Sequence, residues 1–380
     1  MSRPILEIAD LKALARRRVP RMFFDYVDSG AYTEATYRAN EADLAAIKLR
    51  QRVGRKLSDR SLRSTMVGQP VAMPVALAPT GIAGMQHADG EILAAQAAEE
   101  FGVPFTLSTM SVCSIEDVAA RCTKPFWFQL YFMRDRGFVD ALIQRAMQAK
   151  CSALMVTLDL QVVGQRHKDL RNGLSTPPRL GLSTALQLVM RPRWCAQMLA
   201  TRRHRLGNLV GHAKGADDLT SMSAWVADQF DLEFSWEDLA WIRHRWPGKL
   251  ILKGIMDADD AHMAASTGAD AIIVSNHGGR QLDGATSTIS KLPSIVEAVG
   301  DRIEVHMDGG IRSGQDVFRA IALGARGTYI GRPFLYGLGA LGKAGVRLAL
   351  DIIVNELDMT IALCGERHIS EIGRHNLETK

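Results

Sequence analysis

Short apolar runs rich in β-branched and aromatic residues alternate with helical patterns from residue 75 onward. This alternation is typical of βα units with buried parallel strands. The pattern predicts eight strands, at residues 75–79, 103–107, 126–131, 153–159, 249–253, 271–275, 303–307 and 327–331. It also predicts seven helices between them, at residues 91–101, 114–121, 137–150, 235–245, 257–267, 292–299 and 313–323.

The spacing of these strands favours a closed barrel. Successive strands begin 22 to 32 residues apart, except for one interval of 96 residues after the fourth strand. Eight regular strands close a TIM (β/α)8 barrel more readily than they form a doubly wound open sheet, in which the strand order reverses. The long interval therefore indicates an insertion after strand 4 of an α/β barrel.

The whole chain, residues 1–380, is interpreted as one domain with 47% hydrophobic residues, enough for a large core. Its parts are an N-terminal helical cap (1–70, with 5–18 as the clearest helix), the barrel (71–345), a basic insertion (161–219) and C-terminal helices (346–380).

The five cysteines are widely spaced, odd in number and without a C-x-x-C pair, which argues against a disulfide framework and against a thiolate metal site. We therefore expect no metal. Residues 1–12 carry no secretory signal, and no run reaches the roughly 18 apolar residues of a spanning helix. We expect a cytoplasmic protein whose only membrane contact is peripheral.

The formal net charge of +5 is concentrated in one segment. Residues 161–219 hold ten Lys and Arg against three Asp, a net +7, so the remaining residues sum to −2. No pattern of an RNA- or DNA-binding fold with stacking aromatic residues accompanies these charges, so no nucleic-acid partner is expected.

Polar residues or glycines stand at the carboxyl end of every predicted strand, where TIM barrels carry their catalytic groups. A few polar residues there are ordinary, but eight of eight ends with His, Lys, Arg and two Asp favour a catalytic site. The residues are Thr80, Ser108, Gln129, Tyr131, Thr157, Asp159, Lys253, Ser275, His277, Arg280, Asp308, Gly309, Gly310, Gly331 and Arg332.

The motif Ser275-Asn-His-Gly-Gly-Arg-Gln-Leu-Asp283 is the sharpest local feature. His277 is suited to act as a base near neutral pH, and the planar guanidinium of Arg280 is suited to a carboxylate. The alternative is a packed turn histidine, with Arg280 paired to Asp283.

Glycines and cations after strands 7 and 8 predict a phosphate site. Asp308-Gly-Gly-Ile-Arg312 and Gly331-Arg332 supply backbone N–H groups, a helix N-terminus and guanidinium groups. Two ordinary turns are the alternative, and a sugar phosphate fits as well as a flavin nucleotide. The G-x-G-x-x-G match at 337–342 is rejected as a nicotinamide site because no strand directly precedes it.

These residues resemble the FMN-dependent L-2-hydroxy acid oxidases and dehydrogenases over essentially the whole chain. The signature Ser-Asn-His-Gly-Gly-Arg-Gln stands at 275–281, and the flanking pieces at 78–80, 128–131, 252–254 and 308–312 follow the family's order. The resemblance implies a (β/α)8 barrel with FMN as its cofactor.

The resemblance also implies which residues contact the flavin. Pro79 and Thr80 would line it, Ser108, Gln129 and Thr157 would bond its ring edge, and Lys253 would stabilise the reduced ring. The remaining expected cofactor residues are Ser275, Asp308, Gly309, Gly310, Arg312, Gly331 and Arg332.

The resemblance further implies the substrate residues. Arg166 and Arg280 would clamp the carboxylate, and Tyr26 and Tyr131 would touch the carboxylate or hydroxyl. His277, oriented by Asp159, would take a proton, with Tyr131 and Lys253 completing the catalytic set. Whether His277 takes the C2 proton or the hydroxyl proton stays open. The sequence Asp159-Leu-Gln-Val-Val-Gly-Gln-Arg166 lacks the family's usual proline but keeps the arginine.

Two features favour a dehydrogenase over a soluble oxidase. Gly81 and the run at 108–114 look like the bacterial lactate and mandelate dehydrogenases. The apolar runs 186–190 and 194–200, with Arg202, Arg203 and Arg205, suit an anionic membrane surface, against the alternative of a solvated basic loop.

We therefore expect oxidation of L-lactate to pyruvate, with electrons passed to a quinone or cytochrome. The enzyme would be a homotetramer at the inner face of the cell membrane. The alternatives are a soluble oxidase that uses oxygen, a mandelate-type dehydrogenase, and a non-redox phosphate-binding barrel.

Overall fold

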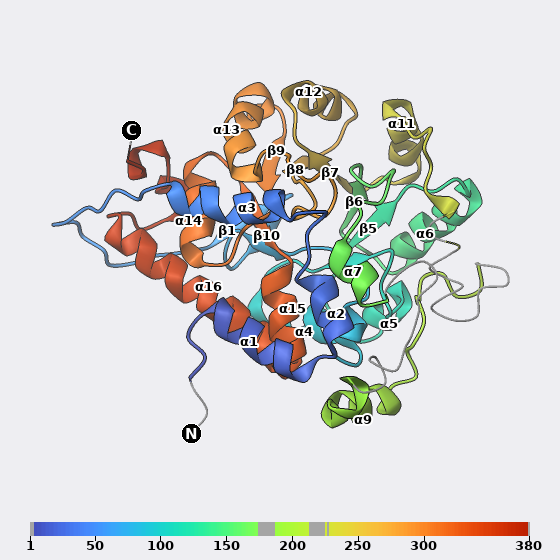
Figure 1. Ribbon diagram of the computed structural model, residues 1–380. Coiled ribbons are helices and arrows are strands. Elements are labelled where there is room, and N and C mark those ends of the chain that lie inside the picture. The colour runs from blue at the N-terminus through green and yellow to red at the C-terminus, as the bar shows by residue number, and fades with distance from the viewer. Residues whose placement is uncertain (1–3, 174–186, 213–224, 226–227, 379–380) are drawn as a thin grey trace.

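The computed structural model describes residues 4–173, 187–212, 225 and 228–378. Helices surround a central ring of parallel strands (Figure 1). The strands are β3 (Val75–Leu77), β4 (Thr106–Ser108), β5 (Trp127–Tyr131), β6 (Ala153–Thr157), β7 (Lys249–Ile255), β8 (Ala271–Val274), β9 (Glu304–Met307) and β10 (Gly327–Ile330).

The eight strands form one parallel sheet in the order β3-β10-β9-β8-β7-β6-β5-β4. The first and last strands of that order meet at a parallel bridge between Leu77 and Phe105. The N–H of Leu77 donates to the carbonyl oxygen of Pro104 at 2.9 Å, which closes the ring. The prediction of a (β/α)8 barrel is confirmed.

Helices follow the strands as the alternating pattern predicts. They are α4 (Gly90–Phe101), α5 (Ile115–Ala119), α6 (Arg136–Gln148), α11 (Trp236–Arg245), α12 (Ala258–Ser266), α13 (Thr288–Val299), α14 (Gly314–Ala322), α15 (Arg332–Leu341) and α16 (Lys343–Leu363). Helix α13 begins four residues before its predicted start, because Asn40 accepts the N–H of Thr288 at 3.2 Å and so satisfies the first turn.

The N-terminal segment is only partly the helical cap expected for residues 1–70. Helices α1 (Ile8–Arg18), α2 (Arg21–Val27) and α3 (Ala35–Ala46) are present, but the chain then forms a hairpin of β1 (Ser64–Met66) and β2 (Gln69–Val71). Met66 packs on Gly327 at the start of β10, and the N–H of Val67 donates to Glu304 at 2.9 Å. The hairpin therefore covers the amino end of the barrel, opposite the carboxyl ends of the strands.

The barrel interior and the helix layer form two separate apolar clusters. The interior combines small residues such as Ala76 and Ala153 with Trp127 and Tyr329. His306 is fully buried beside them, bonded to Tyr329 Oη at 3.1 Å and to Glu304 at 3.0 Å. Both ring nitrogens are thus satisfied, which a buried polar group requires. The amino half of the barrel is a packed core, which leaves the carboxyl end for a site.

The insertion after β6 begins with α7 (His167–Arg171) and includes α9 (Pro192–Ala200), which projects from the body in Figure 1. Trp194 and Arg203, two residues expected to contact lipid, instead contact the body of the protein. Trp194 stacks on Phe23, with ring centroids 5.4 Å apart, and Arg203 is paired with Asp89 and Asp117 at 3.0 and 2.7 Å. Leu186 lies outside the described residues.

The C-terminal part differs from the predicted division at residue 345, because α16 begins at Lys343. The rejected G-x-G-x-x-G match lies inside α15, not at a strand-to-helix turn. A Cβ atom on Gly337 would overlap the carbonyl oxygen of Gly345. The glycines at these positions therefore serve the close packing of α15 and α16, not the binding of a nucleotide.

In the described part of the chain, no helix is both long and apolar enough to cross a bilayer.

Candidate active site

A cavity of about 330 Å³ opens at the carboxyl ends of the strands. Its wall includes most of the residues predicted for the site: Tyr26, Pro79, Thr80, Tyr131, Arg166, Lys253, His277, Arg280, Asp308, Gly309, Gly310, Arg312, Gly331 and Arg332. Ser108, Gln129, Thr157, Asp159 and Ser275 do not line it, but stand at the ends of the same strands. The barrel and the N-terminal segment packed on it thus gather predicted residues as far apart in the sequence as Tyr26 and Arg332.

The loop after β8 turns sharply to present His277. Three successive residues have left-handed backbone conformations, with φ of 57° at His277, 65° at Gly278 and 73° at Gly279. Such a conformation is strained for a histidine, and the surrounding contacts hold it. The N–H of His277 donates to Ser275 Oγ at 3.1 Å.

The imidazole of His277 is oriented by Asp159, which follows β6. Its Nδ1 lies 2.9 Å from Asp159 Oδ1. An ionised carboxylate accepts a hydrogen bond, so Nδ1 carries the proton and Nε2 has the free lone pair. This is the arrangement of a general base with an orienting acid.

The protonation states of this pair follow from burial and neighbouring charge. Burial alone would raise the pKa of Asp159, but Lys253 and His277 outweigh it and lower that pKa. Burial lowers the pKa of His277 below its ordinary value, although Asp159 opposes this shift. At neutral pH the pair therefore consists of a carboxylate and a neutral imidazole, which can accept a proton.

Lys253 places a buried cation next to the pair. Its Nζ donates to Ser275 Oγ at 3.0 Å and lies 3.6 Å from Asp308 Oδ2 and 3.9 Å from Asp159 Oδ2. A buried ammonium is stable only when such partners compensate it. The amine thus links the ends of β6, β7, β8 and β9.

Several buried polar atoms at the strand ends have no partner. Gln129 Oε1 accepts from Ser108 Oγ at 3.0 Å, whereas its Nε2 is buried and unbonded. Asp308 Oδ1 is also buried and unbonded. Buried groups of this kind require a partner, and the heteroatoms of a flavin ring and ribityl chain supply suitable ones.

The loops after β9 and β10 have the shape of a phosphate cradle. Gly309 and Gly310 have φ of 88° and 82°, and a Cβ on Gly310 would overlap the backbone of Asn40. Gly331 precedes α15, whose N-terminus provides unpaired N–H groups. Part of the guanidinium of Arg332 is already used, because it donates to the carbonyl oxygens of Val27, Ser29 and Gly278. Together, the cradle and the unpaired polar atoms fit FMN.

Arg280 points to the N-terminal segment, not to Asp283. Its Nη1 donates to Ser29 Oγ at 3.1 Å and to the carbonyl oxygen of Tyr26, and its guanidinium lies 4.7 Å from the Tyr26 ring centroid. Asp283 instead accepts from Thr33 and Thr36. The alternative in which Arg280 pairs with Asp283 is therefore wrong.

Arg166 lies on the same aromatic ring, 5.8 Å from its centroid, despite the missing proline. Its Nε donates to Asp169 Oδ2 at 2.6 Å. Tyr131 also lines the cavity, and burial, together with Tyr26 and Asp159, raises the pKa of its phenol. The phenol is therefore neutral and able to donate a hydrogen bond.

Sequence reasoning missed two groups of cavity residues. Asp169, three residues after Arg166, is a buried carboxylate whose spacing could have signalled the pair. No sequence pattern indicated the apolar wall of the cavity, because its residues come from separate segments, among them Phe23, Met110, Leu160, Val163, Leu206 and Phe230.

In the described part of the chain, no group of three or more His, Cys, Asp and Glu residues could hold a metal.

Comparison with known proteins identifies the family. A model of the family described as FMN-dependent dehydrogenase matches residues 15–379. The chain is 48% identical to an L-lactate dehydrogenase of Azorhizobium caulinodans over 370 residues, covering 97% of each chain. It is 47% identical to an L-lactate dehydrogenase of Caulobacter vibrioides, covering 96% of this chain and 95% of the relative.

Solved structures agree with this identification. The crystal structure of the monotopic membrane protein (S)-mandelate dehydrogenase matches with a TM-score of 0.95 at 34% identity, covering 100% of both chains. A soluble mutant of the membrane-associated (S)-mandelate dehydrogenase from Pseudomonas putida matches with a TM-score of 0.86 at 34% identity, covering 99% of this chain and 100% of that one. This chain belongs to the FMN-dependent dehydrogenase family, and FMN is its cofactor.

Proposed function

We propose that this enzyme oxidises L-lactate to pyruvate and passes the electrons to a quinone or cytochrome. The observation that carries the proposal is the His277–Asp159 pair, because His277 lines the same cavity as the carboxylate-binding group Arg280 and Asp159 orients its ring from behind. Sequence identity of 46–48% to proteins named L-lactate dehydrogenase supports L-lactate as the substrate.

In this proposal, different residues of the cavity bind the substrate, accept its proton and stabilise the charges that form. Arg280 and Arg166 bind the substrate carboxylate, and Tyr131 donates to an oxygen of the substrate. His277 Nε2 accepts a proton from the substrate, and Asp159 stabilises the imidazolium that forms. Bound FMN would accept the two electrons that leave C2 and the second hydrogen of the substrate. Lys253 would supply positive charge to the bound flavin, and Ser108, Gln129 and Thr157 at the ends of β4, β5 and β6 would bond its ring edge.

An aryl substrate is a second candidate, and the apolar wall favours it. Leu206 and Phe230 line the cavity together with Phe23, so a side chain larger than a methyl group would find apolar contacts there. Similarity to (S)-mandelate dehydrogenase supports the same alternative. A non-redox phosphate-binding barrel is less favoured, because neither His277 nor Arg280 is needed to hold phosphate.

Anaerobic bleaching of the flavin by L-lactate, glycolate and L-mandelate tests the substrate. We expect L-lactate to give the highest bleaching rate per concentration, and a higher rate with L-mandelate would transfer the assignment to the aryl class. Reoxidation is then followed with a quinone analogue and with oxygen. We expect the quinone to react at least about tenfold faster. Equal rates would identify a soluble oxidase instead.

Replacement of His277 by Ala should leave FMN bound, because the site holds the cofactor through other residues. Bleaching by L-lactate should slow by about a hundred- to ten-thousandfold, the usual contribution of a general base. His262→Ala, at an exposed position of α12, is the matched control and should bleach at the wild-type rate. Rapid bleaching of the His277→Ala variant would refute the role of this residue.

The pH profile of kcat/KM for L-lactate should show an acid limb below pH 6.5, because burial lowers the pKa of His277 and the base works only when it is neutral. Asp159 raises the pKa of His277, so Asp159→Asn should move this limb to still lower pH. The same variant should lower kcat by about a hundredfold or more, since the imidazolium loses its counter-charge. A limb that stays in place or moves to higher pH would contradict the coupling.

A membrane surface is the proposed partner of the insertion. Val189 and Met190, next to α9, and Leu199, within it, are 77%, 62% and 86% exposed. Such exposed apolar side chains near Arg191 and Arg193 suit the interface of an anionic bilayer. Similarity to a monotopic membrane enzyme supports a peripheral position at the inner face of the cell membrane. The homotetramer stays a prediction of the resemblance.

Replacing Val189, Met190 and Leu199 together by Ser should lower the affinity of the enzyme for phosphatidylglycerol-rich vesicles by at least about tenfold, because three apolar contacts are lost. The affinity is measured by cosedimentation. Serines at Val53, Met359 and Leu363, which are also exposed, form the matched control. Lactate-dependent bleaching should be equal in both variants. Undiminished vesicle binding of the first variant would exclude this surface as the contact.

A further inference from the structure

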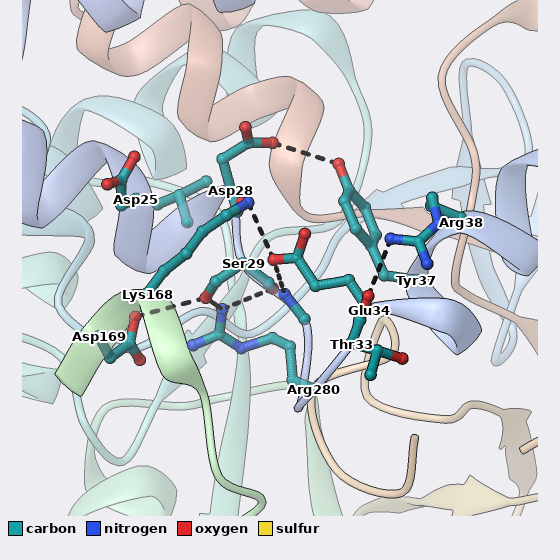
Figure 2. A network of polar contacts seen from close by, with 12 residues as sticks. Asp25, Asp28, Ser29, Thr33, Glu34, Tyr37, Arg38, Lys168, Asp169 and Arg280 are labelled. Atoms are coloured by element: carbon teal, nitrogen blue, oxygen red, sulfur yellow. Dashed lines mark hydrogen bonds and ion pairs between the residues drawn. The ribbon is translucent and has the colours of Figure 1, made fainter. Parts of the chain in front are cut away.

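The carboxylate clamp contains two cations and one anion. Arg166 and Arg280 lie on the Tyr26 ring, and Asp169 is buried beside them with 4% of its surface exposed. In Figure 2, Ser29 stands between Asp169 and Arg280. Its hydroxyl is 3.4 Å from Asp169 Oδ1 and 3.1 Å from Arg280 Nη1.

Other charges around the clamp are paired with each other. Lys168, next to Asp169 in α7, forms an ion pair with Glu34 at 2.9 Å and donates to the carbonyl oxygen of Asp28. The carboxylate of Asp28 pairs with Lys12 at 2.8 Å. These paired groups therefore contribute little net charge to the clamp. Arg332 is a further cation near Arg280, but it belongs to the expected phosphate end of the cavity. The charge of the clamp itself is set by the two arginines and Asp169.

The two arginines have different partners. Arg166 has its own carboxylate, because its Nε donates to Asp169 Oδ2 at 2.6 Å. Within residues 4–173, 187–212, 225 and 228–378, Arg280 contacts only neutral acceptors, on Tyr26 and Ser29. Burial and the nearby charge of Arg166 lower the pKa of Arg280 to about 10. The clamp is thus short of one negative charge.

We propose that Asp169 sets the charge of the acids that this enzyme accepts, by cancelling one of the two arginines so that the clamp is complementary to a single carboxylate. The proposal rests on the proposed function and narrows its substrate class to 2-hydroxy acids with one negative charge. A second carboxylate would enter a clamp that is already neutral, next to the carboxylates of Asp159 and Asp169. Asp169 is a positioning and specificity residue in this account, not a catalytic one.

Oxalate and oxamate provide the test, because they share size and shape but carry two charges and one charge near pH 7. Their dissociation constants are measured with the FMN-loaded enzyme through the change in flavin absorbance. Asp169→Asn removes one negative charge beside the ligand. The affinity ratio of oxalate to oxamate should then rise by about tenfold or more, as expected for one unit charge a few ångströms away in a partly buried site.

Charge counting makes a sharper prediction for Arg166. Arg166→Gln alone should lower the ratio by about tenfold. The double variant Arg166→Gln with Asp169→Asn restores the wild-type net charge, so its ratio should return to within about threefold of the wild-type value. A purely structural role for Asp169 would not give this return. Asp169→Glu keeps the charge and should also keep the ratio.

Asp25→Asn is the matched control, because Asp25 lies in the same region but pairs with Arg21 and Asn172. It should leave the ratio unchanged. An unchanged ratio in Asp169→Asn, or no return in the double variant, would overturn the inference. If Asp169→Asn alone fails to fold, the double variant Arg166→Gln with Asp169→Asn, which removes both members of the ion pair, still decides the matter by comparison with Arg166→Gln. Failure of the proposed function is separate, because it would show as a wild-type flavin that no L-2-hydroxy acid bleaches.

Discussion

The burial of the Lys253 ammonium is the constraint on which the site depends. A buried cation costs several kcal/mol unless anions and hydrogen bonds surround it, and the carboxyl groups of Asp159 and Asp308 both lie within 4 Å of this one. The ionised Asp159 then fixes the tautomer and direction of the His277 ring. Asp308, which lines the cavity, has one buried carboxylate oxygen without a partner. One buried charge thus determines the state of the base and of part of the cofactor site.

Much of the barrel and of its strand ends was predictable from the sequence, for a physical reason. A strand covered on both faces is an almost continuous apolar run, and the residue that ends the run must reach the carboxyl rim. His277 and Lys253 could therefore be placed on a common rim before any contact was known. The left-handed turn at Gly278 and Gly279 was signalled by the glycines themselves.

Other features depend on tertiary contacts that a local pattern does not contain. The hairpin at 64–71 has strands of only three residues, and it is stable because Met66 and Val67 are buried at the amino end of the barrel. In the sequence, Arg203 has no nearby carboxylate and was predicted to be a surface cation, whereas in the fold it pairs with Asp89 and Asp117. The early start of α13 likewise depends on Asn40, which is 248 positions away from Thr288. The sequence-based predictions fail where the contact that stabilises an element or pairs a side chain comes from a residue distant in the sequence.

The insertion is part of the active site as well as a surface element. Asn208, fully buried, donates to the carbonyl oxygens of Ser108 and Thr109 at 3.2 and 3.3 Å. Leu206, two residues earlier, lines the cavity. At its other end the insertion carries Arg166 and Asp169. Because both parts of the segment hold cavity residues, the shape of the pocket is set partly by the segment that also carries the proposed membrane contact.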